Sequence, residues 1–111
     1  MARQRESKLS SDIQKELRKK GAFCFKVWGN EHMMVGLPDI MGTFKGRFFG
    51  LEVKMPESRG NVSPAQQLRQ QQIRAAGGVA EVVCSVSEAV AVMLHLDDPD
   101  WLQITRSADD A

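Results

Sequence analysis

Two stretches decide the fold of this chain: Gly36-Leu37-Pro38-Asp39-Ile40 and Gly50-Leu51-Glu52-Val53-Lys54. Between them, the dipeptide Lys45-Gly46 separates two runs that are rich in apolar residues, 39–44 and 47–54. A short turn that contains Gly between two such runs is typical of a β-hairpin. The sequence therefore predicts two antiparallel strands, in which the end of the second lies beside the start of the first.

The charged residues at this end of the predicted hairpin share one face of the sheet. Successive side chains of a strand point to opposite faces, so Glu52 and Lys54 lie together while Leu51 and Val53 point toward a core. Pairing of the two strands would bring Asp39 to the same face. Two carboxylates at one place suit Mg²⁺, which takes one or two carboxylates and keeps several waters. Such a site can activate water and hold a phosphate.

Length and composition limit the range of functions. A chain of 111 residues with 42% hydrophobic content is expected to form one globular domain. Aromatic residues make up 6% of the chain and Tyr is absent, which argues against a base-stacking platform, since that needs exposed rings. The net charge is +1, so any surface for nucleic acid must be a local patch.

Charge is distributed unevenly along the chain. The first twenty residues are rich in cations, whereas the last fifteen are rich in Asp. Solvated surfaces would explain both, and for the tail this explanation suffices. We expect one domain over 1–96 and an acidic tail over 97–111. The residues concerned are Arg3, Arg5, Lys8, Lys15, Arg18, Lys19 and Lys20, and Asp97, Asp98, Asp100, Asp109 and Asp110.

The two cysteines, Cys24 and Cys84, lack the spacing of a zinc site. We expect them to be buried as small hydrophobic residues in a reducing compartment. The sequence shows no signal peptide and no apolar run of transmembrane length, so the expected location is the cytoplasm, or the host cytoplasm if the protein is viral.

Periodicity predicts an α/β domain with seven principal elements. In the first helix, Leu9, Ile13 and Leu17 form one apolar stripe, and in the fifth element Ser63-Pro64 is typical of a helix start. The helices are expected at 7–20, 64–76 and 87–95, and the strands at 22–28, 39–44, 47–54 and 79–84.

Three further features have structural explanations beside functional ones. The last helix, expected to be capped by Ser87, is apolar nearly all round, which would suit burial against a second chain as well as against the core. His32, in the loop 29–36, could meet a phosphate or a metal, although a lone loop His is more often solvated. Met33 and Met34 are expected to close the core or fold over the cleft.

The motif at the hairpin, Pro38-Asp39 followed by Glu52-x-Lys54, resembles that of the PD-(D/E)xK nucleases. The ordered set of flanking motifs resembles the VRR-NUC family of this superfamily over about residues 6–93. This resemblance implies a restriction-endonuclease-like core in the order α-β-β-β-α-β-α, with a mixed central sheet flanked by helices. The motifs are Glu6, Gly36-Leu37-Pro38-Asp39, Glu52-Val53-Lys54, Ser63-Pro64-Ala65-Gln66 and Ala75-Ala76-Gly77-Gly78.

The resemblance also implies a metal-dependent DNA endonuclease with defined ligands. Asp39 and Glu52 would bind Mg²⁺ or Mn²⁺, and the Val53 carbonyl would add an oxygen ligand. Glu6 would complete the shell directly, through water or at a second metal. Taken alone, Glu6 is better explained as a first-turn residue that complements the positive end of the helix dipole.

Two further residues would assist the chemistry. Lys54 would orient the attacking water or steady the phosphorane. Gln66, in the first turn of its helix, would point into the site and orient the nucleophile or the scissile phosphate; the alternative is a solvated helix packed by one narrow face. Candidate DNA contacts are Lys45, Arg59, Arg69 and Arg74.

The substrate expected is branched DNA, such as a four-way junction, cut by a homodimer with two sites in the manner of a junction (Holliday junction) resolvase. Little chain remains outside the core, so recognition of shape and backbone is favoured over recognition of a long base sequence. The alternatives are a flap or nicking repair nuclease, an inactive nucleic-acid-binding module, and an interaction protein in which Glu52 and Lys54 are an ordinary surface pair.

Overall fold

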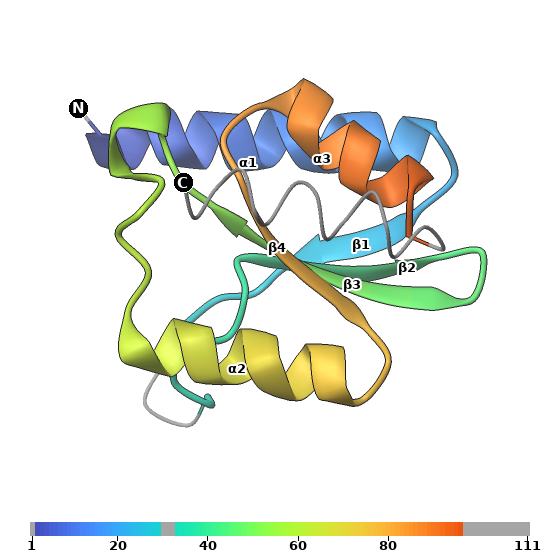
Figure 1. Cartoon of the computed structure of the whole chain (residues 1–111). Coiled ribbons are helices and arrows are strands. Elements are labelled where there is room, and N and C mark those ends of the chain that lie inside the picture. Colours follow the sequence, from blue (N-terminus) through green and yellow to red (C-terminus); the bar gives the residue numbers. More distant parts are fainter. Residues whose placement is uncertain (1, 30–32, 97–111) are drawn as a thin grey trace.

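The computed structural model describes residues 2–29 and 33–96. Its elements follow the predicted order, with a short 3-10 helix added between the hairpin and the second α-helix, so the predicted fold class is confirmed (Figure 1). They are α1 (Ala2–Lys19), β1 (Phe23–Lys26), β2 (Ile40–Phe44), β3 (Arg47–Val53), η1 (Pro56–Ser58), α2 (Pro64–Ala75), β4 (Val79–Val83) and α3 (Val86–Leu94).

The four strands form one mixed sheet in the order β1-β2-β3-β4. The pairs β1–β2 and β2–β3 are antiparallel, and β3–β4 is parallel. A parallel pair needs a long crossover connection, which here contains α2. Figure 1 shows α1 and α3 on one side of the sheet and α2 on the other.

The hairpin between β2 and β3 turns at Lys45-Gly46, as the sequence predicts. Both residues have positive φ, 51° for Lys45 and 81° for Gly46, which is the conformation that a tight two-residue hairpin turn requires. This turn sets Phe44 opposite Arg47 as the first pair and Ile40 opposite Leu51 as the fifth. The turn thereby fixes which residues of the two strands meet at the far end.

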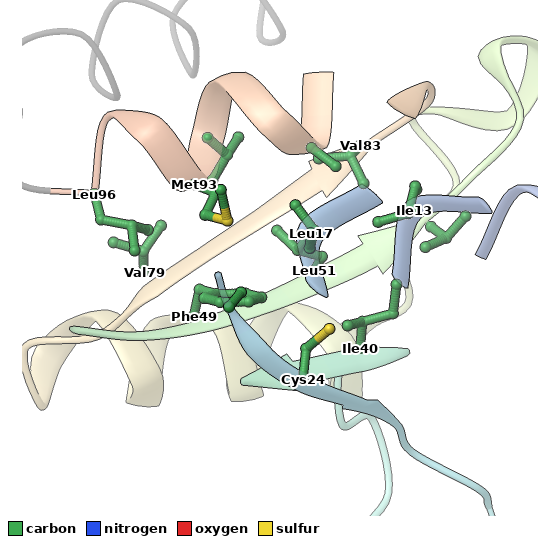
Figure 2. Packing of buried hydrophobic residues seen from close by; sticks show 14 residues of the cluster. Ile13, Leu17, Cys24, Ile40, Phe49, Leu51, Val79, Val83, Met93 and Leu96 are labelled. Atoms are coloured by element: carbon green, nitrogen blue, oxygen red, sulfur yellow. The ribbon is translucent and has the colours of Figure 1, made fainter. Parts of the chain in front are cut away.

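The core lies between the sheet and the helices α1 and α3 (Figure 2). Leu51 and Val53 point into it with 1% and 3% of their surface exposed, as predicted. Both cysteines are buried and not disulfide-bonded, and burial raises the pKa of the Cys24 thiol. The buried cluster comprises Ile13, Leu17, Ala22, Cys24, Ile40, Phe49, Leu51, Val53, Val79, Val83, Ala89, Val92, Met93 and Leu96.

Two helix starts differ from the predictions. The first helix begins at Ala2 rather than at residue 7, so Glu6 lies in its second turn and no acidic residue occupies the first turn. The explanation of Glu6 as a first-turn residue is therefore wrong. The last helix is capped by Ser85, not Ser87, and the Ser85 side chain accepts a hydrogen bond from the Glu88 amide.

Burial corrects one further expectation and bears on another. Met33 and Met34 are exposed by 39% and 58%, so neither closes the core. The apolar helix α3 buries Val92 and Met93 within the chain and packs on α1, which leaves Leu94, 59% exposed, as its large exposed apolar residue. One chain thus covers most of the apolar surface of α3.

Some regions of the sequence fall outside this description. His32 and the expected tail at 97–111 lie outside the described residues. Among the residues that are described, no helix is long and apolar enough to cross a membrane.

Candidate active site

The hairpin register brings the two predicted carboxylates together. Asp39 directly precedes β2, and Ile40 pairs with Leu51, so Asp39 stands beside Glu52 of β3. Asp39 is held there because its Oδ2 accepts a hydrogen bond of 2.8 Å from the Val53 amide. This bond ties the start of one strand to the end of the other.

Glu52 lies on the sheet face that α2 covers, and it is buried, with 4% of its surface exposed. Its pKa is raised from 4.5 to about 8, first by burial and then by the charge of Asp39 and a hydrogen bond with it. The charge of Glu6 raises this pKa further, whereas the ammonium of Lys54 lowers it. The raised pKa favours a proton on the pair of Asp39 and Glu52 when no cation is bound, and both Lys54 and Glu6 lie within electrostatic range.

Gln66 connects the first turn of α2 to this pair. Its Nε2 donates a hydrogen bond of 2.9 Å to Glu52 Oε1, as the prediction that Gln66 points into the site requires. Its Oε1 accepts from the Ser63 amide at 2.9 Å, while Ser63 Oγ accepts from the Gln66 amide at 3.1 Å. This capping box fixes which end of the amide faces Glu52. The spacing Ser63-x-x-Gln66 is the sequence signal of this capping box, which the prediction of Ser63 as the helix cap did not include.

Two glycines and a proline allow the surrounding backbone to approach closely. Gly36 has φ 86°, and a Cβ there would lie 2.5 Å from the carbonyl of Ala65 at the start of α2. A Cβ at Gly50 would lie 2.7 Å from Pro38 Cγ. The Gly-Leu-Pro-Asp segment therefore lies directly between β3 and the first turn of α2, where it places Asp39.

Glu6 does not join the carboxylate pair directly. It lies one helical turn from Ser10, which is 2% exposed, so it is close to the inward stripe of α1 as predicted. Within residues 2–29 and 33–96, no group of three or more His, Cys, Asp or Glu side chains is arranged to hold a metal ion. Asp39 and Glu52 are thus the close pair, and Glu6 acts on them from farther away.

The four basic residues predicted to contact DNA differ in their surroundings. Lys45 is exposed at the hairpin turn, at the opposite end of β3 from Glu52, with its Nζ 5.3 Å from the Phe44 ring centroid. The three arginines make bonds within the chain: Arg59 pairs with Glu88, Arg69 donates to the Val35 carbonyl, and Arg74 donates to the Ala80 carbonyl. Their role in binding DNA stays a prediction.

The donor set fits a hard divalent cation. Two adjacent carboxylates, of which Glu52 is buried, repel each other when both are ionised, and a cation between them would remove that cost. Asp39 and Glu52 supply oxygen ligands, which Mg²⁺ and Mn²⁺ prefer. Site and fold together define a class: an α/β domain with a carboxylate pair at the end of a hairpin, beside a lysine and a capping glutamine.

Comparison with known proteins identifies the fold. A solved structure described as a VRR_NUC domain superposes with a TM-score of 0.65 at 20% sequence identity, covering 81% of this chain and 95% of that chain. The fold predicted from the resemblance to the VRR-NUC family is therefore confirmed. No protein-family model matches the sequence, and no curated protein matches it.

Proposed function

We propose that this protein is a metal-dependent DNA endonuclease of the VRR-NUC family that hydrolyses phosphodiester bonds. The observation that carries the proposal is the pair of Asp39 and Glu52, which Gln66 and the Val53 amide hold in place. A binding module has no use for buried carboxylates where a phosphate would lie, since they would repel it. The nuclease fold of the solved neighbour supports the same conclusion.

The chain's own residues would have separate tasks. Asp39 and Glu52 would hold Mg²⁺ or Mn²⁺, which supplies a bound water of lowered pKa and neutralises charge on the phosphate. The Val53 carbonyl and Glu6 are the further ligands proposed, Glu6 directly or through water. Lys54 would orient the attacking water, a task for its compact ammonium that Arg could not take over.

Gln66 would act as a positioning residue. Its amide contributes a hydrogen bond without adding negative charge to a site that already holds two carboxyl groups. The capping box leaves Nε2 directed at Glu52, so the amide keeps one carboxylate oxygen engaged and orients the other. Contact of the amide with the scissile phosphate oxygen is the alternative task.

The finer proposal is that the substrate is branched DNA and the enzyme a homodimer. A four-way junction has two-fold symmetry, and two sites related by the same symmetry could cut it in matched positions. The described chain forms one compact α/β unit and holds one candidate site, so paired cuts need a second copy. Sedimentation at the concentrations used for cleavage measures the number of copies directly.

The test is cleavage of labelled four-way junction, flap, single-stranded and linear duplex DNA, each with Mg²⁺, Mn²⁺ or EDTA. We expect metal-dependent cutting that Glu52→Ala abolishes and that Asp12→Asn leaves unchanged. Asp12 is a matched control because it is a carboxylate of α1 engaged with Lys8.

Symmetric cuts confined to the junction would support the resolvase, and equal cutting of flaps or plain duplex by a monomer would contradict it. Binding of DNA without cutting of any substrate would instead identify an inactive binding module.

A further inference from the structure

Exposed phenylalanine rings cover the part of the sheet that α2 leaves open. Phe23 and Phe25 of β1 are exposed by 68% and 46%, and Phe48 of β3 by 36%. The register sets Phe23 opposite Thr43, which pairs in turn with Phe48, so the three side chains form one row across the sheet. The low aromatic content predicts no base-stacking platform, because such a platform needs exposed rings, but the structure shows that such rings are present.

These rings lie on the same face as the candidate site. Phe25 pairs with Met41, which pairs with Gly50, and a Cβ at Gly50 would meet Ile73 of α2. Glu52 follows Gly50 by two residues on the same face. Along the strand direction, the pairs that contain Phe23, Phe25 and Glu52 therefore follow one another on this face. Each step between neighbouring rows is about 7 Å.

An apolar groove extends this surface toward α2. It has a volume of about 300 Å³ and is lined by Phe48, Gln72, Ile73, Ala76 and Gly78. The ring of Phe48 thus borders both the open sheet and the groove. The surface formed by Phe23, Phe25, Met41, Thr43 and Phe48 is called the aromatic face below.

The charges around the aromatic face favour an anionic partner. In β1, β2, β3 and α2 the only acidic residue is Glu52, whereas α2 and the hairpin turn contain three cations, Lys45, Arg69 and Arg74. Lys26 and Arg47 lie on the opposite face, because they alternate with Phe25 and Phe48 along their strands. A second copy packed on the aromatic face would meet these three cations, and the four elements offer no carboxylate outside the site to pair with them.

Strand pairing between two copies is also disfavoured at this edge of the sheet. β1 is an edge strand, and the Cys24 carbonyl accepts a hydrogen bond of 3.1 Å from Arg18 Nη2. Arg18 belongs to α1, and its guanidinium covers a carbonyl that an added strand would need, which hinders the addition of another strand.

We propose that the aromatic face binds unstacked bases of the DNA strand whose phosphate lies at Asp39 and Glu52. The centroids of the Phe23 and Phe25 rings are 6.1 Å apart, which exceeds the spacing of about 3.4 Å between stacked nucleotides of B-DNA. Bases that lie on these two rings must therefore be separated from each other, as bases at a branch point or in a single strand are. The aromatic face would thus select DNA that contains unpaired nucleotides next to the cleavage position.

This inference rests on the proposed function, because it takes the partner to be DNA. The test measures binding in EDTA, where no cutting occurs, by fluorescence anisotropy of labelled single-stranded, forked and blunt duplex DNA. The protein is the full chain, with Phe23→Leu, Phe25→Leu and Phe23→Tyr, and with Leu94→Ala as the control. Leu94 is a matched control because it is exposed on α3, across the sheet from the aromatic face.

We expect each Phe→Leu change to weaken binding of single-stranded and forked DNA at least about fivefold, as loss of one base–ring stack does. Blunt duplex binding should change less than twofold, and Phe23→Tyr, which retains a ring, should bind as wild type does. The Leu variants retain apolar area, so circular dichroism should show them folded.

Three results would overturn the proposal. The first is wild-type binding of single-stranded DNA by both Leu variants, and the second is equal losses on all three DNAs. The third concerns the double variant Phe23→Ala and Phe25→Ala. If it is a monomer where the wild type is a dimer, and its DNA affinity is unchanged, then the aromatic face joins two copies of the chain. If neither the wild type nor any variant cuts DNA, but binding still depends on the Phe rings, the proposed nuclease activity would be refuted. The proposal that the aromatic face binds bases would remain supported.

Discussion

Two buried glutamates lie on neighbouring strands, and their partners differ. Glu81 of β4 is 3% exposed, and its carboxylate lies 3.8 Å from Arg74 Nη2. Glu52 of β3 is 4% exposed, but its neighbours are a second carboxyl group, Asp39, and the neutral amide of Gln66. A buried charge that only stabilises a fold is expected beside an opposite charge.

The difference in partners indicates that Glu81 has a structural role and that Glu52 is the candidate for metal binding. The Arg74 guanidinium also donates to the Ala80 carbonyl, so the pair with Glu81 ties α2 to β4. Glu52 is hydrogen-bonded to Gln66 and Asp39, and the nearby Lys54 lowers its pKa less than burial and Asp39 raise it, so that the pKa stands at about 8. Strongly perturbed carboxyl groups cluster at functional sites, because reaction or metal binding needs them there.

Cleavage should show the largest contrast between the two glutamates. We expect Glu52→Gln to lower the rate of metal-dependent DNA cutting well over tenfold, because it removes a ligand needed in the transition state. Glu81→Gln should retain cutting within about threefold when compared at equal folded fraction, since its cost is one of stability. Single-turnover assays with both variants measure this, and equal losses would end the distinction.

The pH dependence of stability should separate them next. Because the pKa of Glu52 is raised from 4.5 to about 8 in the folded state, its contribution to the free energy of unfolding is greatest below pH 4.5. This contribution is lost as the pH rises through 8. In EDTA, Glu52→Gln should therefore flatten the decline in stability between pH 5 and pH 8, measured by urea denaturation.

Glu81→Gln serves as the control in that measurement. Comparison of the two slopes between pH 5 and pH 8 separates the loss of a carboxyl paired with an arginine from the loss of the Glu52 carboxyl. An unchanged decline in Glu52→Gln would show that the carboxyl of Glu52 is not the titrating group.

The smallest contrast concerns the partner residues. Glu52 is bonded to the amide of Gln66, whereas Glu81 lies beside Arg74. Gln66→Glu can still accept the hydrogen bond from Ser63, because Glu is a natural third residue of a capping box. It also places a third carboxyl group against Glu52, so we expect near-wild-type stability with cutting lowered several-fold. Gln67→Glu, one position along on the exposed side of α2, should leave cutting unchanged. Thermal melts and cleavage assays on both variants measure this, and an equal loss of cutting in both would contradict the prediction.

Local chemistry made much of this architecture predictable. Lys45-Gly46 supplies the two positive φ angles of the hairpin turn, and the period of two along β3 assigns Leu51 and Glu52 to opposite faces. Ser63-Pro64 marks the start of α2, so the position of Gln66 in its first turn follows. These are short-range signals, and tertiary structure did not override them.

The errors come from two sources. The start of α1 is polar and lacks periodicity, so its first turn gave no signal. At the start of α3, Ser85 and Ser87 are both possible caps, and the Glu88 three residues after Ser85 was the distinguishing feature. The exposure of Phe23 and Phe25 was not predictable from alternation, because alternation assigns faces without saying which face a helix covers.

The central claim is that Asp39 and Glu52 together form a divalent metal site. The direct test is calorimetric titration of the metal-free protein with Mn²⁺ at pH 7, in buffers of different ionisation enthalpy. We expect wild type and Glu81→Gln to bind with release of a proton, because Glu52 must ionise to bind a metal. Glu52→Gln should bind at least tenfold more weakly and release none. Equal binding of Mn²⁺ by Glu52→Gln and wild type would contradict the account.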